Sequence, residues 1–180
     1  GQFIMNADFN TKTSHETLDR CTSRFLSEYG VTGFCHMDSI KEYLKPDERY
    51  LDSPAWKKHT NHNMYHHLPP AIQRHYADTE GLSLDKWILY GQLFQATTYG
   101  RTIEALRFRK QDPVDDCAGA LIWMFNDAWG ETGWTPIDYY LRRKPSYYWI
   151  RHACAPVRAI VRRRGNQLVT RVVNDTIVER

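Results

Sequence analysis

The clearest periodic pattern in the chain predicts a long helix from about residue 84 to 107. Apolar residues recur there at steps of three and four, which places them on one helical face: Leu89, Leu93, Ala96, Tyr99, Ile103 and Leu106. On the same helical wheel Gln92, Gln95 and Arg101 fall outside this face. Asp112-Pro113 ends the helix, because the residue before a proline disfavours helical backbone.

Two apolar segments on either side of this helix predict strands. Residues 24–27 form a short strand that Tyr29-Gly30 stops. Residues 118–125 are an apolar run without alternation, which predicts a strand buried on both faces, as in a parallel sheet. Strand, long helix and strand make a βαβ unit, so the fold class is α/β.

Shorter elements surround this unit. Thr13-x-x-Glu16 is a capping box and predicts a short helix that runs to about Cys21. Four prolines between residues 37 and 84 indicate short helices joined by ordered loops. A further helix is expected from Pro145 to about Ala153, since proline is favoured near a helix start.

The chain changes character after residue 155. Residues 157–163 alternate apolar and basic side chains, and residues 168–173 alternate again after a Gly165-Asn166 turn. This pattern predicts a half-buried antiparallel hairpin with its arginines pointing outward. Because two strands are not stable alone, we expect residues 156–180 to begin a second, truncated domain after a first domain of residues 1–155.

The amino-acid composition excludes few classes of function. The net charge of +3 gathers near the C-terminus, in too narrow a face to favour nucleic acid. No apolar run is long enough to cross a bilayer, no signal peptide is recognisable, and the chain reads as a piece of something longer. His59, His62 and His66 would share a helical face, but no H-E-x-x-H or paired cysteine spacing accompanies them, so we predict no metal and no cofactor.

Two segments carry candidate chemistry. Glu28 follows a strand and precedes a glycine turn, where barrel enzymes keep catalytic groups; a surface carboxylate, or one paired with Arg24, is the alternative. Near the end of the second strand, indoles and polar side chains suit a sugar site, although the tryptophans could equally cap the core. These residues are Trp123, Asn126, Asp127, Trp129 and Trp134.

Together these motifs resemble the β-mannosidase branch of glycoside hydrolase family 2, in the family's order from about residue 18 to 176. The matching stretches are 24–30, 92–96, 104–107, 119–129, 134–140, 144–148, 155–157 and 173–176. The resemblance implies the C-terminal portion of a (β/α)8 TIM barrel, with its strands seven and eight, followed by the first strands of an immunoglobulin-like β-sandwich. It makes Glu28 the nucleophile and places Trp123 beside the bound sugar. Met124 and Gly130 depart from the Gln and Pro that are frequent in the family.

The implied function is that of a retaining exo-β-glycosidase, with a terminal β-linked sugar as substrate. In the family, the acid/base is the Glu of an Asn-Glu pair that precedes this region, and no such dipeptide occurs here. We therefore expect the segment alone to be inactive and unstable, and to have the rest of its own polypeptide as partner, with neither nucleic acid nor membrane. A periplasmic, secreted or lysosomal location agrees with the resemblance. The alternative is a non-catalytic module that binds carbohydrate or protein.

Overall fold

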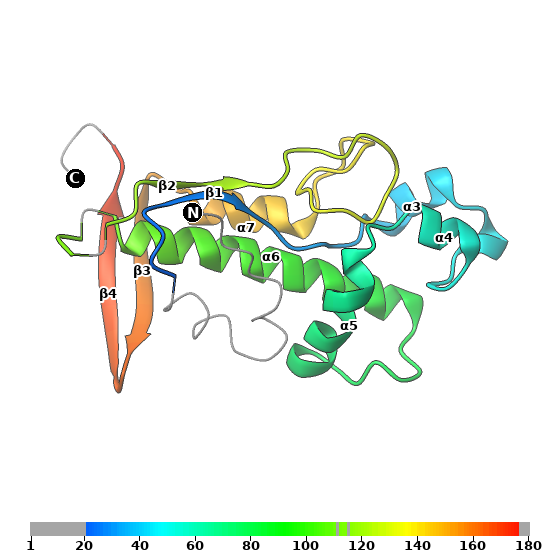
Figure 1. The fold of residues 1–180 in the computed structure, drawn as a ribbon, viewed down its shortest axis with the longest axis horizontal. Helices are drawn as coiled ribbons and strands as arrows, with labels where there is room; N and C mark the ends of the chain where they lie inside the picture. Colours follow the sequence, from blue (N-terminus) through cyan, green and yellow to red (C-terminus); the bar gives the residue numbers. More distant parts are fainter. Residues whose placement is uncertain (1–20, 111, 115, 177–180) are drawn as a thin grey trace.

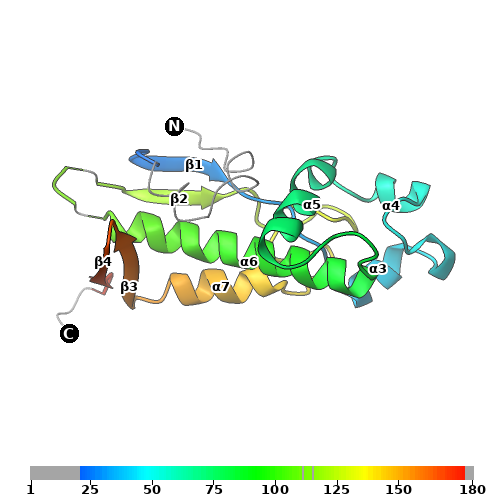
Figure 2. The same ribbon diagram turned by 90° about the horizontal axis from the view of Figure 1, so that it is seen from below.

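A computed structural model describes residues 21–110, 112–114 and 116–176, and it has an α/β core (Figure 1). A two-stranded parallel sheet lies over the long helix α6, and α7 runs alongside α6 (Figure 2). Small helices gather at one end of α6, and a β-hairpin lies at the other end. The elements are β1 (Phe25–Tyr29), α3 (Met37–Tyr43), the 3-10 helix η1 (Pro46–Glu48), α4 (Pro54–Lys58), α5 (Asn63–His75), α6 (Leu84–Phe108), β2 (Gly119–Ile122), α7 (Pro145–Ala153), β3 (Val157–Arg164) and β4 (Gln167–Asn174).

The predicted βαβ unit is confirmed, since α6 connects the parallel strands β1 and β2. The helix predicted after Pro145 and the short helices between residues 37 and 84 are also present. The helix predicted from residue 13 lies outside the described residues. Within the described part of the chain, no helix has the length and apolar character that crossing a bilayer requires.

The predicted buried face of α6 is wrong in part. Leu89 is 41% exposed, whereas Gln92 and Gln95 are buried. The glutamines turn inward because backbone carbonyls of the loop after β1 lie against the helix and need donors. Gln92 Nε2 donates to the carbonyl of Cys35 over 3.1 Å, and Gln95 Nε2 donates to that of Val31 over 3.0 Å.

The strand predicted over residues 118–125 is shorter than expected and is not buried on both faces. Only Gly119–Ile122 form β2, and Leu121 and Phe125 are 56% and 75% exposed. Among the described residues, β2 pairs with β1 alone, and helices cover only one face of this sheet. Within residues 21–110, 112–114 and 116–176, no helix covers the other face of this sheet (Figure 2).

The hairpin is confirmed in its strands and turn, but the predicted outward orientation of its arginines is wrong in part, since Arg163 and Arg164 are exposed whereas Arg162 is buried. Ile160 and Arg162 are buried against α6, while Val161 and Leu168 are exposed. The C-terminal end of α6 explains this orientation, because its last carbonyls lack helical partners and attract cations. Three guanidinium groups surround the Phe108 ring at 5.7–5.8 Å from its centroid, and they belong to Arg162, Arg164 and Arg171.

Candidate functional site

Glu28 lies near the C-terminal end of β1, next to the end of β2. The Trp123 amide donates to the carbonyl of Tyr29 over 2.9 Å, which joins the two strand ends. Tyr29 is buried against Tyr99 of α6, with an edge-to-face contact of 5.7 Å between ring centroids. The register of β1 shifts between Leu26 and Tyr29, which are both buried in the core, and Glu28 lies within this irregular part of the strand. It is partly buried there, and the Trp123 indole beyond the end of β2 is half exposed.

Gly30 allows the loops that follow the two strands to approach each other closely. A Cβ at this position would lie 2.4 Å from the carbonyl oxygen of Trp123, 2.9 Å from Tyr99 Oη and 3.2 Å from the Trp134 ring. Only glycine fits so near another backbone. The glycine two residues after Glu28 therefore lets the Trp123 carbonyl and the Trp134 ring lie close to the end of β1.

Tyr99 ties these segments to α6. Its hydroxyl is fully buried, accepts from the Val31 amide over 3.3 Å and donates to the carbonyl of Trp134. Burial raises the pKa of this hydroxyl well above its usual range, so it stays protonated and able to donate. The Tyr99 hydroxyl thus holds the backbone of two loops next to the candidate site, at Val31 and at Trp134.

Replacing Gly30 with alanine should disturb the site more than the fold. The added methyl must displace the Trp123 carbonyl or the Trp134 ring, and overpacking of this kind costs about 1–3 kcal/mol. We expect a fall of about tenfold or more in kcat/KM of the full-length protein, with a lowered thermal midpoint. Gly81→Ala is the control: nothing lies within 4 Å of its added Cβ, but its φ of 67° strains an alanine, so this variant should lower the thermal midpoint while leaving kcat/KM unchanged. Equal activities of the two variants would contradict this role for Gly30.

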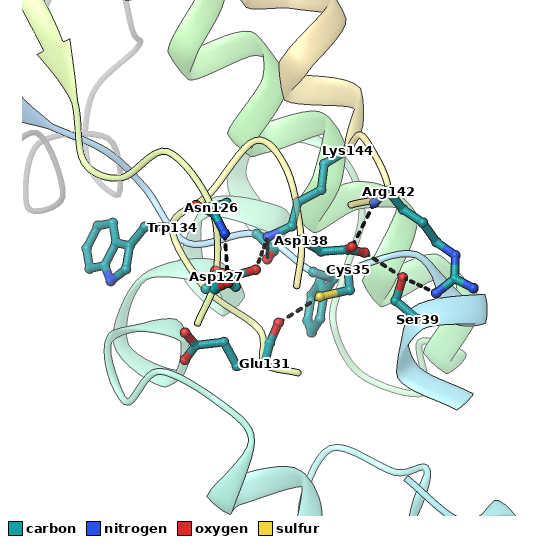
Figure 3. A network of polar contacts seen from close by, with 12 residues as sticks. Cys35, Ser39, Asn126, Asp127, Glu131, Trp134, Asp138, Arg142 and Lys144 are labelled. Atoms are coloured by element: carbon teal, nitrogen blue, oxygen red, sulfur yellow. Dashed lines mark hydrogen bonds and ion pairs between the residues drawn. The ribbon is translucent and has the colours of Figure 1, made fainter. Parts of the chain in front are cut away.

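A buried ion pair lies beneath the loop after β2 (Figure 3). Lys144 Nζ is 3.6 Å from Asp127 Oδ2 and donates to the carbonyl of Gly33 over 3.3 Å, and both charged side chains are fully buried. Burial raises the pKa of Asp127, while Lys144 opposes this rise. Asp127 is 1% exposed, so it reaches the candidate subsite only through the loops that it supports.

Further polar contacts extend from this pair toward α3 (Figure 3). Ser39 Oγ donates to Asp138 Oδ2 over 2.5 Å, and the Arg142 amide donates to Asp138 Oδ1 over 2.9 Å. Sequence reasoning missed Lys144, Ser39 and Asp138 as supports of the site. The only signal was that residues 138 and 144 fall inside stretches that carry the family resemblance.

The structure divides the predicted sugar-site residues into two groups. The Trp123 carbonyl and the Trp134 ring both lie against Gly30, and Asn126 is exposed in the same loop, where its Nδ2 donates to the carbonyl of Asp127. Trp129 is 40% exposed and packs instead on His59, with 4.5 Å between ring centroids. The described residues contain no group of three His, Cys, Asp or Glu side chains that could hold a metal.

No family model matches the chain. Beta-mannosidase B of Aspergillus niger is 30% identical to it over 165 residues, which cover 88% of this chain and 19% of that protein. The corresponding protein of Aspergillus flavus is 29% identical over the same shares. The chain thus spans about a fifth of the length of these relatives.

Solved structures agree with these matches. A Beta-D-Mannosidase from Dictyoglomus thermophilum matches with a TM-score of 0.79 and 28% identity, over 94% of this chain and 20% of that one. The exo-chitosanase of Amycolatopsis orientalis shares the fold, with a TM-score of 0.68 and 21% identity over 84% of this chain and 18% of that one. In sequence and in fold, the chain is similar to a segment of these β-mannosidases, in agreement with the resemblance to glycoside hydrolase family 2.

Proposed function

We propose that the protein containing this chain is a retaining exo-β-glycosidase of the β-mannosidase type, with Glu28 as its nucleophile. The observation that carries this proposal is that Glu28 and Trp123 lie at the adjacent C-terminal ends of two parallel strands. Barrel enzymes keep their catalytic groups at this end of their strands. The similarity to β-mannosidases supports the choice of substrate class.

In the proposed reaction, a Glu28 carboxylate oxygen attacks the anomeric carbon of a terminal β-linked sugar. The bond from that carbon to the glycosidic oxygen breaks, and the oxygen takes a proton from a second carboxyl group about 5–5.5 Å away. Water then hydrolyses the glycosyl ester, restoring the Glu28 carboxylate with overall retention of configuration. We assign the second carboxyl to another part of the full polypeptide.

We further propose that residues 1–155 supply strands seven and eight of a (β/α)8 barrel with their helices, and that residues 156–180 begin an immunoglobulin-like β-sandwich. The outer face of the hairpin supports the second assignment, because Val161, Leu168 and Val172 are 55–77% exposed on it. An apolar sheet face of this kind is usual inside a sandwich, where a second sheet covers it.

Trapping of the glycosyl-enzyme tests the nucleophile directly. Incubation of the full-length protein with a 2-deoxy-2-fluoro-β-mannosyl fluoride should leave one sugar on the peptide that contains Glu28, as peptide mass spectrometry would reveal. The 2-fluorine slows both formation and breakdown of the covalent intermediate, whereas the good fluoride leaving group speeds its formation alone, so the intermediate accumulates. A label on a different carboxylate would refute the assignment. Sugar binding without turnover would favour a non-catalytic carbohydrate-binding module instead.

A further inference from the structure

Four aromatic rings from separate segments form one continuous stack beside the candidate site. The Tyr140 and Tyr43 rings are parallel within 2° at 6.4 Å, Tyr43 and His59 are 4.9 Å apart, and His59 and Trp129 are 4.5 Å apart. The guanidinium of Arg142 lies 5.5 Å from the Tyr140 ring at one end of the stack. At the other end is the indole of Trp129, which is 40% exposed.

His59 is fixed to the loop that carries Trp129. The Thr132 amide donates to the His59 carbonyl over 2.8 Å, and His59 Nδ1 lies 2.6 Å from the carbonyl oxygen of Gly130. A carbonyl oxygen can only accept, so Nδ1 carries the hydrogen, and in the neutral ring Nε2 is the acceptor. This bond sets both the tautomer and the plane of the imidazole under the indole.

Gly130 is part of the same arrangement. A Cβ there would lie 2.4 Å from the Tyr43 ring, so the loop backbone rests directly on the second ring of the stack. Glycine at this position, where the family frequently has proline, therefore allows Tyr43 and His59 to pack directly below the loop. The side chains and the loop backbone fit one another as a unit.

Trp129 is restrained at its edge as well as on one face. A hydrogen bond from its indole lowers the pKa of the Glu131 carboxyl, against the rise that burial of this group causes. An exposed indole that is held on one face and at its N–H has lost its rotational freedom before any ligand arrives. Such preorganisation favours binding of a flat apolar surface to the remaining face.

We propose that His59 is a positioning residue, which holds the Trp129 indole as a preformed platform for the C–H face of a sugar ring. The inference rests on the proposed function, because it takes the ligand to be a carbohydrate. His59 acts through Trp129 and touches no reacting atom. Its role is to make sugar binding tighter, with little effect on the chemical step.

The test uses steady-state hydrolysis of 4-nitrophenyl β-D-mannopyranoside by the full-length protein. His59→Ala should raise KM about three- to tenfold, the range expected for loss of one aromatic contact, with kcat within about twofold of wild type. His59→Phe keeps a ring under the indole and should keep KM within about twofold. A merely structural role would lower kcat and the thermal midpoint together, and that result would overturn the inference. Tyr50→Ala, at an exposed ring elsewhere, should change neither constant.

A double-mutant cycle shows whether His59 acts through Trp129. Trp129→Ala should raise KM at least as much as His59→Ala does, and the double variant should resemble Trp129→Ala alone. Additive effects, or an unchanged KM in His59→Ala, would overturn the inference. The proposed function is tested apart from this by turnover in wild type. If wild type shows none, the same cycle is measured on mannose affinity by calorimetry, where loss of coupling again refutes the role of His59.

Discussion

Glu28→Gln is expected to lower kcat of the full-length protein by about 10⁴-fold or more, the scale seen when a catalytic nucleophile is removed. The amide is nearly the same size as the carboxylate, but it carries no charge and cannot form the glycosyl ester. Because Glu28 is only partly buried at a strand end, the fold should remain stable within about 1 kcal/mol. Steady-state kinetics with an aryl β-mannoside, together with thermal unfolding, provides the measurement.

Glu80→Gln is the matched control for this loss. Glu80 is exposed in the segment between α5 and α6, so the same change of charge there should leave kcat unaltered. If Glu28→Gln retained more than about a tenth of wild-type turnover, position 28 would not be the nucleophile. If instead the variant unfolded, the residual activity would carry no information about chemistry, which is why both measurements are made on one preparation.

The sequence predicted those elements whose pattern depends on local spacing. Periodicity or turn residues predicted three of the observed elements. These are the helix Leu84–Phe108, the helix Pro145–Ala153 and the hairpin after residue 156. The position of Glu28 near a strand end also followed from local pattern, whereas Trp123 lies inside the predicted strand and comes directly after β2 only because that strand ends early.

Polar side chains that serve distant backbone groups were not predictable in this way. Gln95 and Arg162 are buried because carbonyls of Val31 and of Ala105 face them, and a helical wheel or an alternating pattern records only polarity. Lys144 is an extreme case, since it donates to Gly33, 111 positions earlier in the chain. Such partners become visible only when the loops are placed in space.

The same limit explains why the predicted sugar-site residues divided into two groups. Composition and the resemblance gave Trp123, Trp129 and Trp134 as one set, but Trp134 and Trp129 lie against residues of different segments. Gly30 admits Trp134 beside Trp123, whereas His59 supports Trp129. The His-rich segment was weighed for metal binding, and its first histidine instead belongs to an aromatic stack.

Lys144→Met is expected to destabilise the full-length protein by about 3–5 kcal/mol near neutral pH, because it leaves the Asp127 carboxylate buried without its cation. Methionine fills a similar volume, so the loss reflects charge and the bond to Gly33 more than a cavity. Denaturation followed by tryptophan fluorescence measures the effect. Lys58→Met, at an exposed lysine, should change stability by less than about 0.5 kcal/mol.

The pH dependence of this loss identifies its cause. Burial raises the pKa of Asp127 in the folded state, so the native protein holds more protons than the unfolded chain and stability falls as pH rises through that window. Removing Lys144 removes an interaction that lowers this pKa, which extends the window upward. The variant should therefore lose more stability at about pH 8 than at about pH 5. Adding Asp127→Asn to Lys144→Met should abolish this difference and recover part of the stability, whereas a loss that is equal at both pH values would trace the effect to packing.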